Sequence, residues 1–293
     1  MPYQFSSPSI TESSKRTGRP PVEITPQQAR SEAIRLLPSL TPQCWDVMEL
    51  LAATGAAMAI QIQAVRERTL HKYARLRIVD RLPVPAETVR EQCAIYGLTD
   101  AGRIYTLGPV GLELAKMRGL TPSTGHMAYP LSRVMHDVIL TEILLRISRH
   151  AAGRGWSVTW IGTAEAALFT PDRSREVLEP DALLRLTKDG EERLFALEYH
   201  NEDKRSRAER KVDQYEAVCA VNAALWMEQW ETAAFPTLLA VFRHDIVGKG
   251  YVDKLSGMQP QVRYYGKLLS GVLQGNLDQW LNLSTRKKEN IFP

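Results

Sequence analysis

The stretch from Glu179 to Tyr215 constrains the fold of this chain more than any other stretch. Two mostly apolar runs, residues 182–186 (ALLRL) and 194–199 (LFALEY), have the length of strands, and Lys188-Asp189-Gly190 between them is a hairpin signal. Apolar residues then recur at helical spacing from Glu202 to Ala224. The sequence therefore predicts an antiparallel strand pair followed by a long helix.

Acidic residues lie at the same end of this predicted strand pair. Asp181 precedes the first strand and Glu198 ends the second, while Lys211 follows on the helix. Carboxylate oxygens are the ligands that Mg²⁺ and Mn²⁺ prefer, and a metal-bound water can attack a phosphodiester. His200 is a candidate general base or phosphate contact. A metal-dependent phosphodiesterase site and a descendant of one that has lost its activity both fit this pattern.

Length and composition indicate a globular protein. The chain has 293 residues, of which 44% are hydrophobic and 24% charged, enough for two ordinary domains or one large one. Cys44, Cys93 and Cys219 are far apart, which argues against a disulfide framework or a zinc ribbon. No run approaches the roughly 18 apolar residues of a membrane span, and the N-terminus has no apolar signal segment. We expect a cytoplasmic protein without membrane contact.

Residues 1–28 are rich in Ser, Thr and Pro and are predicted to form a disordered basic tail. The tail contains Gly18-Arg19-Pro20, similar to the core of an AT-hook. Arg19 is therefore a candidate DNA contact, since an extended arm can place an arginine in a narrow A·T minor groove. A solvated basic tail is the alternative.

Residues 29–122 are predicted to form a winged helix-turn-helix domain. Capping residues and apolar spacing predict its helices, and a strand-like run is expected to form part of the wing. These elements are helices at Ala29–Leu37, from Thr41-Pro42 to Gly55 and at Ala64–Val79, a strand-like run at Thr88–Leu98, and a further helix that starts at Leu98.

The third predicted helix has a basic face. Arg68, Lys72 and Arg75 are spaced i, i+4 and i+7, while Leu70, Tyr73 and Leu76 form a separate apolar stripe. A recognition helix needs this arrangement, because one face packs on the domain while the other meets phosphates and base edges. The alternative is the solvated face of a bundle helix. The candidate DNA-binding residues are Arg66, Arg68, Lys72, Arg75 and Arg77, together with Arg19.

Residues 130–283 are predicted to form an α/β domain after a hinge at 121–130. The elements expected are a helix at Leu131–Ala151, a strand at Trp156–Ile161, a buried central strand at Thr237–Phe242 and a last helix at Gly266–Leu283. Residues 284–293 are expected to be a basic tail. The predicted fold class is thus α+β, a winged helix followed by an α/β domain with a small mixed sheet.

Several short motifs follow one another in a characteristic order. They are Tyr96–Arg103 (YGLTDAGR), His136-Asp137, Pro180-Asp181-Ala182, Leu197-Glu198 and Lys211–Tyr215 (KVDQY). In order and spacing, over roughly residues 40 to 245, they resemble the replication-relaxation family of bacterial plasmids and integrative elements. The resemblance implies a DNA-binding protein that assists replication, relaxation or transfer of a mobile element.

The second half also resembles the PD-(D/E)xK nuclease fold. The resemblance implies that Asp181 and Glu198 hold Mg²⁺ or Mn²⁺ and that Glu142, on an upstream helix, completes the metal site. His200 stands where that family has its lysine, and Lys211 can substitute from the following helix. His136-Asp137, with no second histidine at ligand spacing, is interpreted as a surface or domain-contact pair.

Three functions remain open from the sequence. The first is a double-stranded DNA-binding accessory or regulatory protein of a mobile element, acting as a homodimer and in company with a relaxase or other element proteins. The second is a divalent-metal-dependent DNA endonuclease that the winged helix directs to its site. The third is a dimeric transcriptional repressor.

Overall fold

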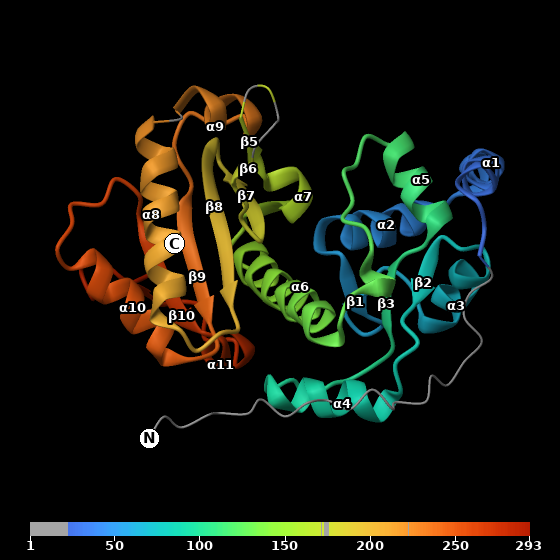
Figure 1. Ribbon diagram of the computed structural model, residues 1–293, viewed down its shortest axis with the longest axis horizontal. Coiled ribbons are helices and arrows are strands. Elements are labelled where there is room, and N and C mark those ends of the chain that lie inside the picture. Colours follow the sequence, from blue (N-terminus) through green and yellow to red (C-terminus); the bar gives the residue numbers. More distant parts are fainter. Residues whose placement is uncertain (1–22, 171, 173–175, 222) are drawn as a thin grey trace, which may run out of the picture.

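The computed structural model describes residues 23–170, 172, 176–221 and 223–293 (Figure 1). Arg19 and most of the predicted tail lie outside these residues, but helix α1 already begins at Pro26, inside the range predicted to be a tail. The described chain mixes helices and strands, which confirms a fold with both α and β structure. Figure 1 shows a smaller helical lobe with a short sheet beside a larger lobe built on a long sheet.

The smaller lobe, residues 23–120, packs its helices around a three-stranded antiparallel sheet in the order β1-β3-β2. Thr25 caps α1 in a capping box with Gln28, and the Thr41 hydroxyl accepts from the Cys44 N–H at 3.3 Å to cap α2. Gly55, at φ 78°, ends α2 as expected. The elements of the smaller lobe are α1 (Pro26–Leu36), a 3₁₀ turn (Leu37–Ser39), α2 (Pro42–Thr54), β1 (Ala56–Met58), α3 (Glu67–Arg75), β2 (Val79–Arg81), α4 (Ala86–Ile95), β3 (Ile104–Leu107) and α5 (Pro109–Met117).

Two predictions for this lobe are wrong. The strand-like run Thr88–Leu98 is largely helix α4, and no helix starts at Leu98, where the chain instead forms a loop before β3. The physical reason is the spacing of Val89, Cys93 and Tyr96, which lie one helical turn apart and are all buried. That period of three to four residues decides the structure, although the residue types also suit a strand.

The larger lobe is built on a seven-stranded mixed sheet in the order β12-β11-β10-β9-β8-β7-β4. Strands β8, β9 and β10 run parallel, and the other neighbours are antiparallel. Asp189 and Gly190, both at positive φ, form the tight turn between β7 and β8 that the sequence predicted. The strands are β4 (Ser157–Gly162), β7 (Ala182–Lys188), β8 (Glu191–His200), β9 (Thr237–Phe242), β10 (Tyr264–Leu268), β11 (Trp280–Asn282) and β12 (Lys288–Glu289).

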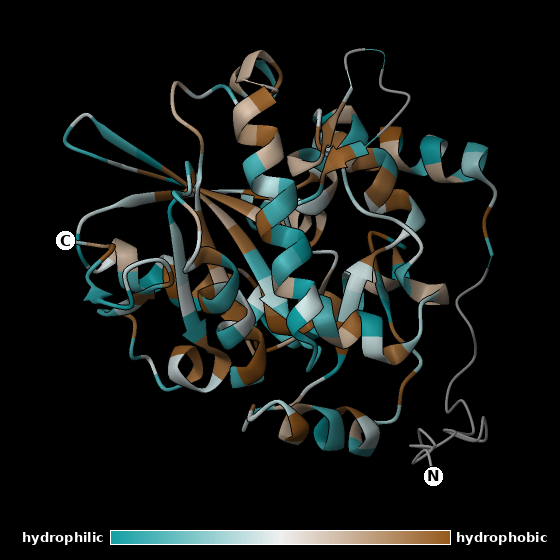
Figure 2. Ribbon diagram, turned by 60° about the vertical axis from the view of Figure 1, so that its left-hand side comes forward, coloured by the Kyte–Doolittle hydropathy of each residue, from teal (hydrophilic) through white to brown (hydrophobic). Residues whose placement is uncertain are grey.

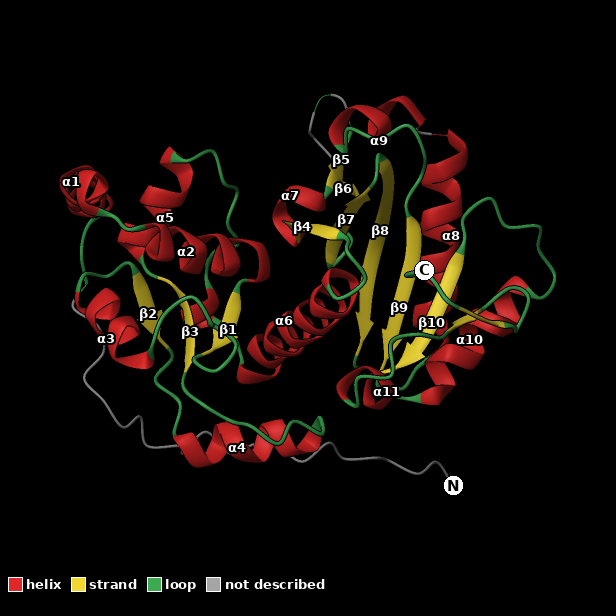
Figure 3. Cartoon of the chain, turned by 180° about the vertical axis from the view of Figure 1, so that it is seen from behind, coloured by secondary structure: helices red, strands yellow, loops and turns green. Residues whose placement is uncertain are grey.

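Helices cover both faces of this sheet (Figure 3). Helix α6 packs with Leu197 and Tyr199 of β8, whereas α8 and α10 pack with Ala196 on the opposite face. The helices and remaining short elements are a 3₁₀ turn (His126–Ala128), α6 (Leu131–Ala152), α7 (Thr163–Ala166), β5 (Leu168–Phe169), β6 (Glu176–Leu178), α8 (Arg205–Val221), α9 (Ala223–Gln229), α10 (Asp245–Leu255) and α11 (Leu269–Leu273).

The C-terminal part departs from two expectations. The predicted helix Gly266–Leu283 is replaced by β10, α11 and β11, because residues 264–268 pair in parallel with β9. The stretch predicted to be a basic tail contains β12, and the side chains of Ile291 and Phe292 are buried. The sheet is mixed, as predicted, but with seven strands it is not small.

One hydrophobic core runs through both lobes. Ala56, Met58 and Val89 of the smaller lobe belong to the same buried cluster as Val138 of α6 and Leu197 of β8. Figure 2 shows hydrophobic residues along the central strands of the sheet. The Thr141 hydroxyl of α6 donates to the Ala56 carbonyl at 2.8 Å across the same contact. Within the described residues, no helix has both the length and the apolar character needed to cross a bilayer.

Candidate functional site

A polar cleft of about 700 Å³ lies where β8 ends and β7 begins. The first turns of α6, the loop 122–129 and the end of α2 form its other walls. Its charged or titratable side chains are His126, Arg133, His136, Asp137, Glu179, Asp181, Glu198, His200, Glu202 and Arg207. The cleft thus lies between the two lobes and at the carboxyl end of β8, a place in the sheet where α/β proteins commonly bind ligands.

Asp181 and Glu198 lie side by side, as the sequence predicted. Ala182 pairs with Leu197 in the antiparallel ladder. Asp181, just before Ala182, and Glu198, just after Leu197, therefore stand opposite one another. The Asp181 Oδ2 atom accepts the Tyr199 N–H at 2.6 Å, which fixes this carboxylate at the mouth of the cleft.

Glu198 is almost completely buried, with 2% of its surface exposed. Its Oε1 atom accepts hydrogen bonds from Lys211 Nζ at 2.7 Å and from the Tyr215 hydroxyl at 2.8 Å. Burial raises the pKa of Glu198 to about 7, although Lys211 lowers it, and the nearby Asp181 carboxylate raises it further. The structure therefore brings Asp181, Glu198 and Lys211 together, as the sequence predicted.

His200 is also buried, on the α8 and α10 side of β8. Its Nε2 atom lies 2.8 Å from the Tyr251 hydroxyl, and burial lowers the pKa of His200 to about 3. A histidine with this pKa is neutral near pH 7 and accepts protons weakly. Its contact with Tyr251 indicates that it organises the core beneath the cleft.

Glu142 does not lie at this cleft. It faces a second pocket, where its carboxylate accepts from Gln61 Nε2 at 3.1 Å and from Arg146 Nε at 2.7 Å. The prediction of Glu142 as the third metal ligand is therefore wrong. The packing of α6 against the smaller lobe decides which face of α6 points toward Asp181 and Glu198. That face carries His136 and Asp137 instead.

A chain of imidazoles and carboxylates crosses the cleft. His126 Nε2 lies 3.2 Å from Asp137 Oδ2, His136 Nδ1 lies 3.4 Å from Asp137 Oδ1, and His136 Nε2 lies 3.8 Å from Asp181 Oδ2. Burial alone lowers the pKa of His136, but Asp181 and Asp137 outweigh it and raise the pKa to about 9. His136 is thus a cation at neutral pH, held between two carboxylates.

Sequence reasoning missed His126. This residue lies in the turn-rich stretch 121–130, and its buried ring packs over Gly55 at the end of α2, where a Cβ atom would come within 2.3 Å of Nε2. The sequence shows Gly55 and the His136-Asp137 pair, but only the folded chain brings them together with His126.

The donor set fits a hydrated Mg²⁺ or Mn²⁺ ion better than a site made only of protein ligands. Across residues 23–170, 172, 176–221 and 223–293, no three His, Cys, Asp or Glu side chains are arranged to hold a metal ion. Asp181 and Glu198 supply two carboxylates, and Mg²⁺ commonly takes one or two carboxylates while water and substrate phosphate complete its shell.

Three of the candidate DNA-binding residues lie on α3, which contributes no residue to the Asp181 cleft. Arg68, Lys72 and Arg75 are exposed on one face of α3, and Arg66 is exposed just before it. Within the part of the chain that the structure describes, no carboxylate lies in ion-pair distance of these four residues. The opposite face carries Leu70, which is fully buried.

Two residues of this region depart from their predicted roles. Leu76, predicted to belong to the apolar stripe, is 40% exposed because α3 ends at Arg75. The Arg77 guanidinium, predicted to contact DNA, binds the buried Asp80 carboxylate at 2.8 Å and is only 17% exposed. Arg77 thus holds the turn between α3 and β2 rather than facing solvent.

No family model, curated protein or solved structure matches this chain. Its function is therefore inferred from its residues and their geometry.

Proposed function

We propose that this chain is a double-stranded DNA-binding protein whose helix α3 is the recognition helix of a winged helix-turn-helix. The observation that carries the proposal is the row of exposed cations Arg68, Lys72 and Arg75, which have no ion-pair partner among the described residues, on a helix whose other face is buried through Leu70. Such a helix can enter a major groove while its cations contact phosphates and base edges.

The surrounding elements support a winged-helix assignment with one departure. Helices α2 and α3 pack with an antiparallel sheet of three short strands, of which β1 lies between the two helices and β2 and β3 follow α3 as the strands of a wing do. The segment between β2 and β3 is not a free wing, because it contains α4 and packs on the larger lobe. There the Asn201 amide donates to the Tyr96 hydroxyl at 3.2 Å, and the Arg243 guanidinium lies 4.9 Å from the centre of the Tyr96 ring. DNA contacts therefore rest on α3.

The resemblance to the replication-relaxation family gives the biological setting of this proposal. The chain would act as an accessory or regulatory protein in replication, relaxation or transfer of a bacterial mobile element, with a relaxase as a partner. A homodimer would place two α3 helices in successive major grooves of an inverted repeat. The third function considered above, a dimeric transcriptional repressor, would use the same α3 contacts on a different DNA target.

Gel-shift titrations over a range of salt concentrations test the proposal. The double variant Arg68→Ala and Lys72→Ala should bind duplex DNA more weakly, and its plot of log K against log salt should be shallower by about two units. Arg30→Ala with Arg210→Ala is the matched control, since both residues are exposed and lie away from α3. Unchanged affinity and unchanged salt dependence in the α3 variant would reject α3 as the DNA-binding element.

A second candidate function is a metal-dependent DNA endonuclease with a PD-(D/E)xK-like site. The observation that favours it is the meeting of Asp181, Glu198 and Lys211 at one end of the strands. Asp181 and Glu198 would hold Mg²⁺ or Mn²⁺, and the ion would supply an activated water and charge for the scissile phosphate. Lys211 orients Glu198 and adds positive charge beside that phosphate.

Incubation of supercoiled DNA with the pure protein and Mn²⁺ tests the second function. Nicking should occur with the natural chain and disappear in the isosteric double variant Asp181→Asn and Glu198→Gln, which keeps the shape of the buried site. Nicking that persists in the double variant would come from a contaminant. DNA binding without any nicking would leave the first function standing and reject the second.

A further inference from the structure

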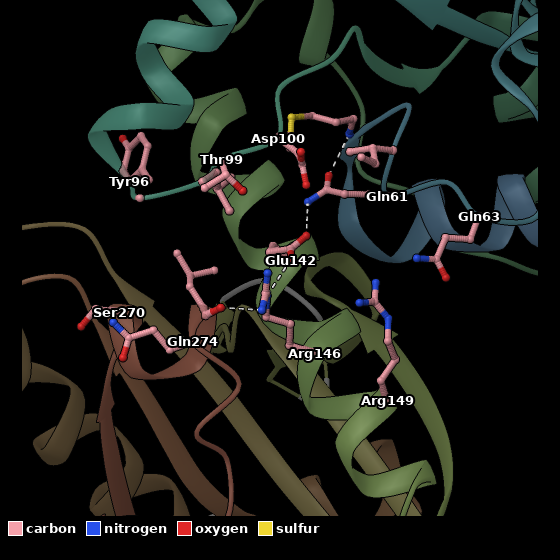
Figure 4. A pocket seen from close by; sticks show the side chains of 15 residues that line it. Gln61, Gln63, Tyr96, Thr99, Asp100, Glu142, Arg146, Arg149, Ser270 and Gln274 are labelled. Atoms are coloured by element: carbon pink, nitrogen blue, oxygen red, sulfur yellow. Dashed lines mark hydrogen bonds and ion pairs between the residues drawn. The ribbon is translucent and has the colours of Figure 1, made fainter.

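A second pocket, of about 520 Å³, lies between the lobes on the other side of α6 (Figure 4). Its walls come from four segments that are distant in sequence: residues 58–63 at the end of β1 and after it, the loop 96–100 after α4, helix α6 and helix α11. Small-molecule sites commonly have volumes of this order and lie between structural units. Neither the proposed DNA-binding helix nor the Asp181 cleft contributes to it.

The floor of this pocket is held rigidly. Gln61, only 2% exposed, accepts from the Met58 N–H at 2.8 Å and donates to Glu142 Oε2 at 3.1 Å. Glu142 in turn accepts from Arg146, whose guanidinium also donates to the Leu273 carbonyl at 2.5 Å. This chain of bonds fixes the side chains before any ligand arrives, which lowers the entropic cost of binding.

The remaining charges stand at the pocket walls. Glu142 and Arg146 neutralise each other, which leaves Arg149 on α6 and Asp100 on the smaller lobe. Neither Arg149 nor Asp100 has an ion-pair partner among the residues that the structure describes. A ligand with an anionic group at one end and N–H donors at the other would satisfy both walls.

The uncharged lining suggests the rest of the ligand. Figure 4 shows Gln63 beside Arg149 on one side and Ser270 with Gln274 on the other. Their amides and hydroxyl can both donate and accept hydrogen bonds, as the edge of a nucleobase requires. Leu98 and Leu273 supply apolar surface for the flat faces of a base. A free amino acid would fill only a part of the available volume.

We infer that this pocket binds a nucleotide, with the phosphate at Arg149 and the base near Asp100. The inference goes beyond DNA recognition and does not depend on it, because the pocket residues and α3 do not overlap. A bound nucleotide would contact both lobes at once.

Isothermal titration of the full chain with nucleoside monophosphates tests the inference, with adenosine, inorganic phosphate and glutamate as comparison ligands. At least one monophosphate should bind with a stoichiometry of one per chain, and adenosine and phosphate alone should each bind at least about tenfold more weakly. Arg149→Gln should weaken binding of that nucleotide by about tenfold or more, because it removes a charge-assisted hydrogen bond. Arg149 is exposed, so the variant should fold, and Arg30→Gln on α1 is the matched control.

Three outcomes of the titrations, and a fourth seen only in the α3 variant, would overturn the inference. The three are no saturation by any monophosphate up to about 1 mM, binding of glutamate in place of nucleotides, and nucleotide binding that Arg149→Gln leaves unchanged. Binding that is lost only in the Arg68→Ala and Lys72→Ala variant would place the nucleotide on α3 and overturn it as well. DNA binding by the Arg149→Gln variant should stay normal, so failure here is distinguishable from failure of the DNA-binding proposal.

Discussion

Glu198 shows how burial and pairing act on one carboxylate. Burial favours its protonated form, while Lys211 and Tyr215 donate to Oε1 and favour the ionised form, and burial dominates. The folded pKa of about 7 is therefore above the ordinary value of 4.5. A group whose pKa is raised by folding stabilises the folded state most at low pH.

The stability of the natural chain relative to Glu198→Gln should therefore depend on pH. The contribution of Glu198 is complete below about pH 4.5 and is lost as the pH rises to about 7, with a total change on the order of 3 kcal/mol. Urea unfolding of both proteins across this range, with EDTA present, measures the difference. His200, whose lowered pKa acts in the opposite direction, is common to both proteins and cancels. A difference that is constant with pH would contradict the raised pKa.

Local sequence was enough to predict part of the site and not the rest. Asp181, Glu198 and Lys211 come together because a hairpin and the helix that follows it fix their places within a short stretch. Glu142 was misplaced and His126 was missed because their neighbours are set by how α6 and the loop 122–129 pack on α2. Contacts between distant segments leave little trace in a single sequence.

Elements with a strong periodic pattern were predicted well. The helix Leu131–Ala152, the β7–β8 hairpin and the buried strand Thr237–Phe242 all appear close to their expected bounds. The region 264–283 was predicted wrongly, because β10 becomes a strand through parallel pairing with β9. Local sequence propensity carries no information about that pairing. The winged-helix and nuclease-like assignments remain proposals.

The close contact between α2 and β4 can be tested by substituting Gly162. A Cβ atom on Gly162 would lie 2.1 Å from the Ala53 carbonyl oxygen, so Gly162→Ala must push β4 and α2 apart. We expect a loss of about 1–3 kcal/mol in the free energy of unfolding, measured with urea. Gly257→Ala is the control, because among the described residues no atom beyond its chain neighbours lies within 4 Å of its Cβ position, and it should change stability little. Equal stability of both variants would mean that α2 and β4 are not in close contact.

At the scale of the whole molecule, the shared core should make the lobes unfold together. Phe292, fully buried near the C-terminus, belongs to the same cluster as Met58 of the smaller lobe. Phe292→Ala should lower the free energy of unfolding by about 3–5 kcal/mol and keep one cooperative transition. Coincident urea curves from circular dichroism and tryptophan fluorescence would show this, and Met258→Ala, at an exposed site, is the control. Two separated transitions would indicate independent lobes.

The segment between β2 and β3 has a consequence for how such a chain can evolve. Because α4 contributes Val89, Cys93 and Tyr96 to a core that it shares with α6, neither lobe can be exchanged for an unrelated one without exposing apolar surface. Substitutions at this boundary must be compensated on the facing lobe, so the two lobes should diversify as one inherited unit. Under the proposed function, new DNA targets would then arise through changes on the outer face of α3, which the core leaves free to vary.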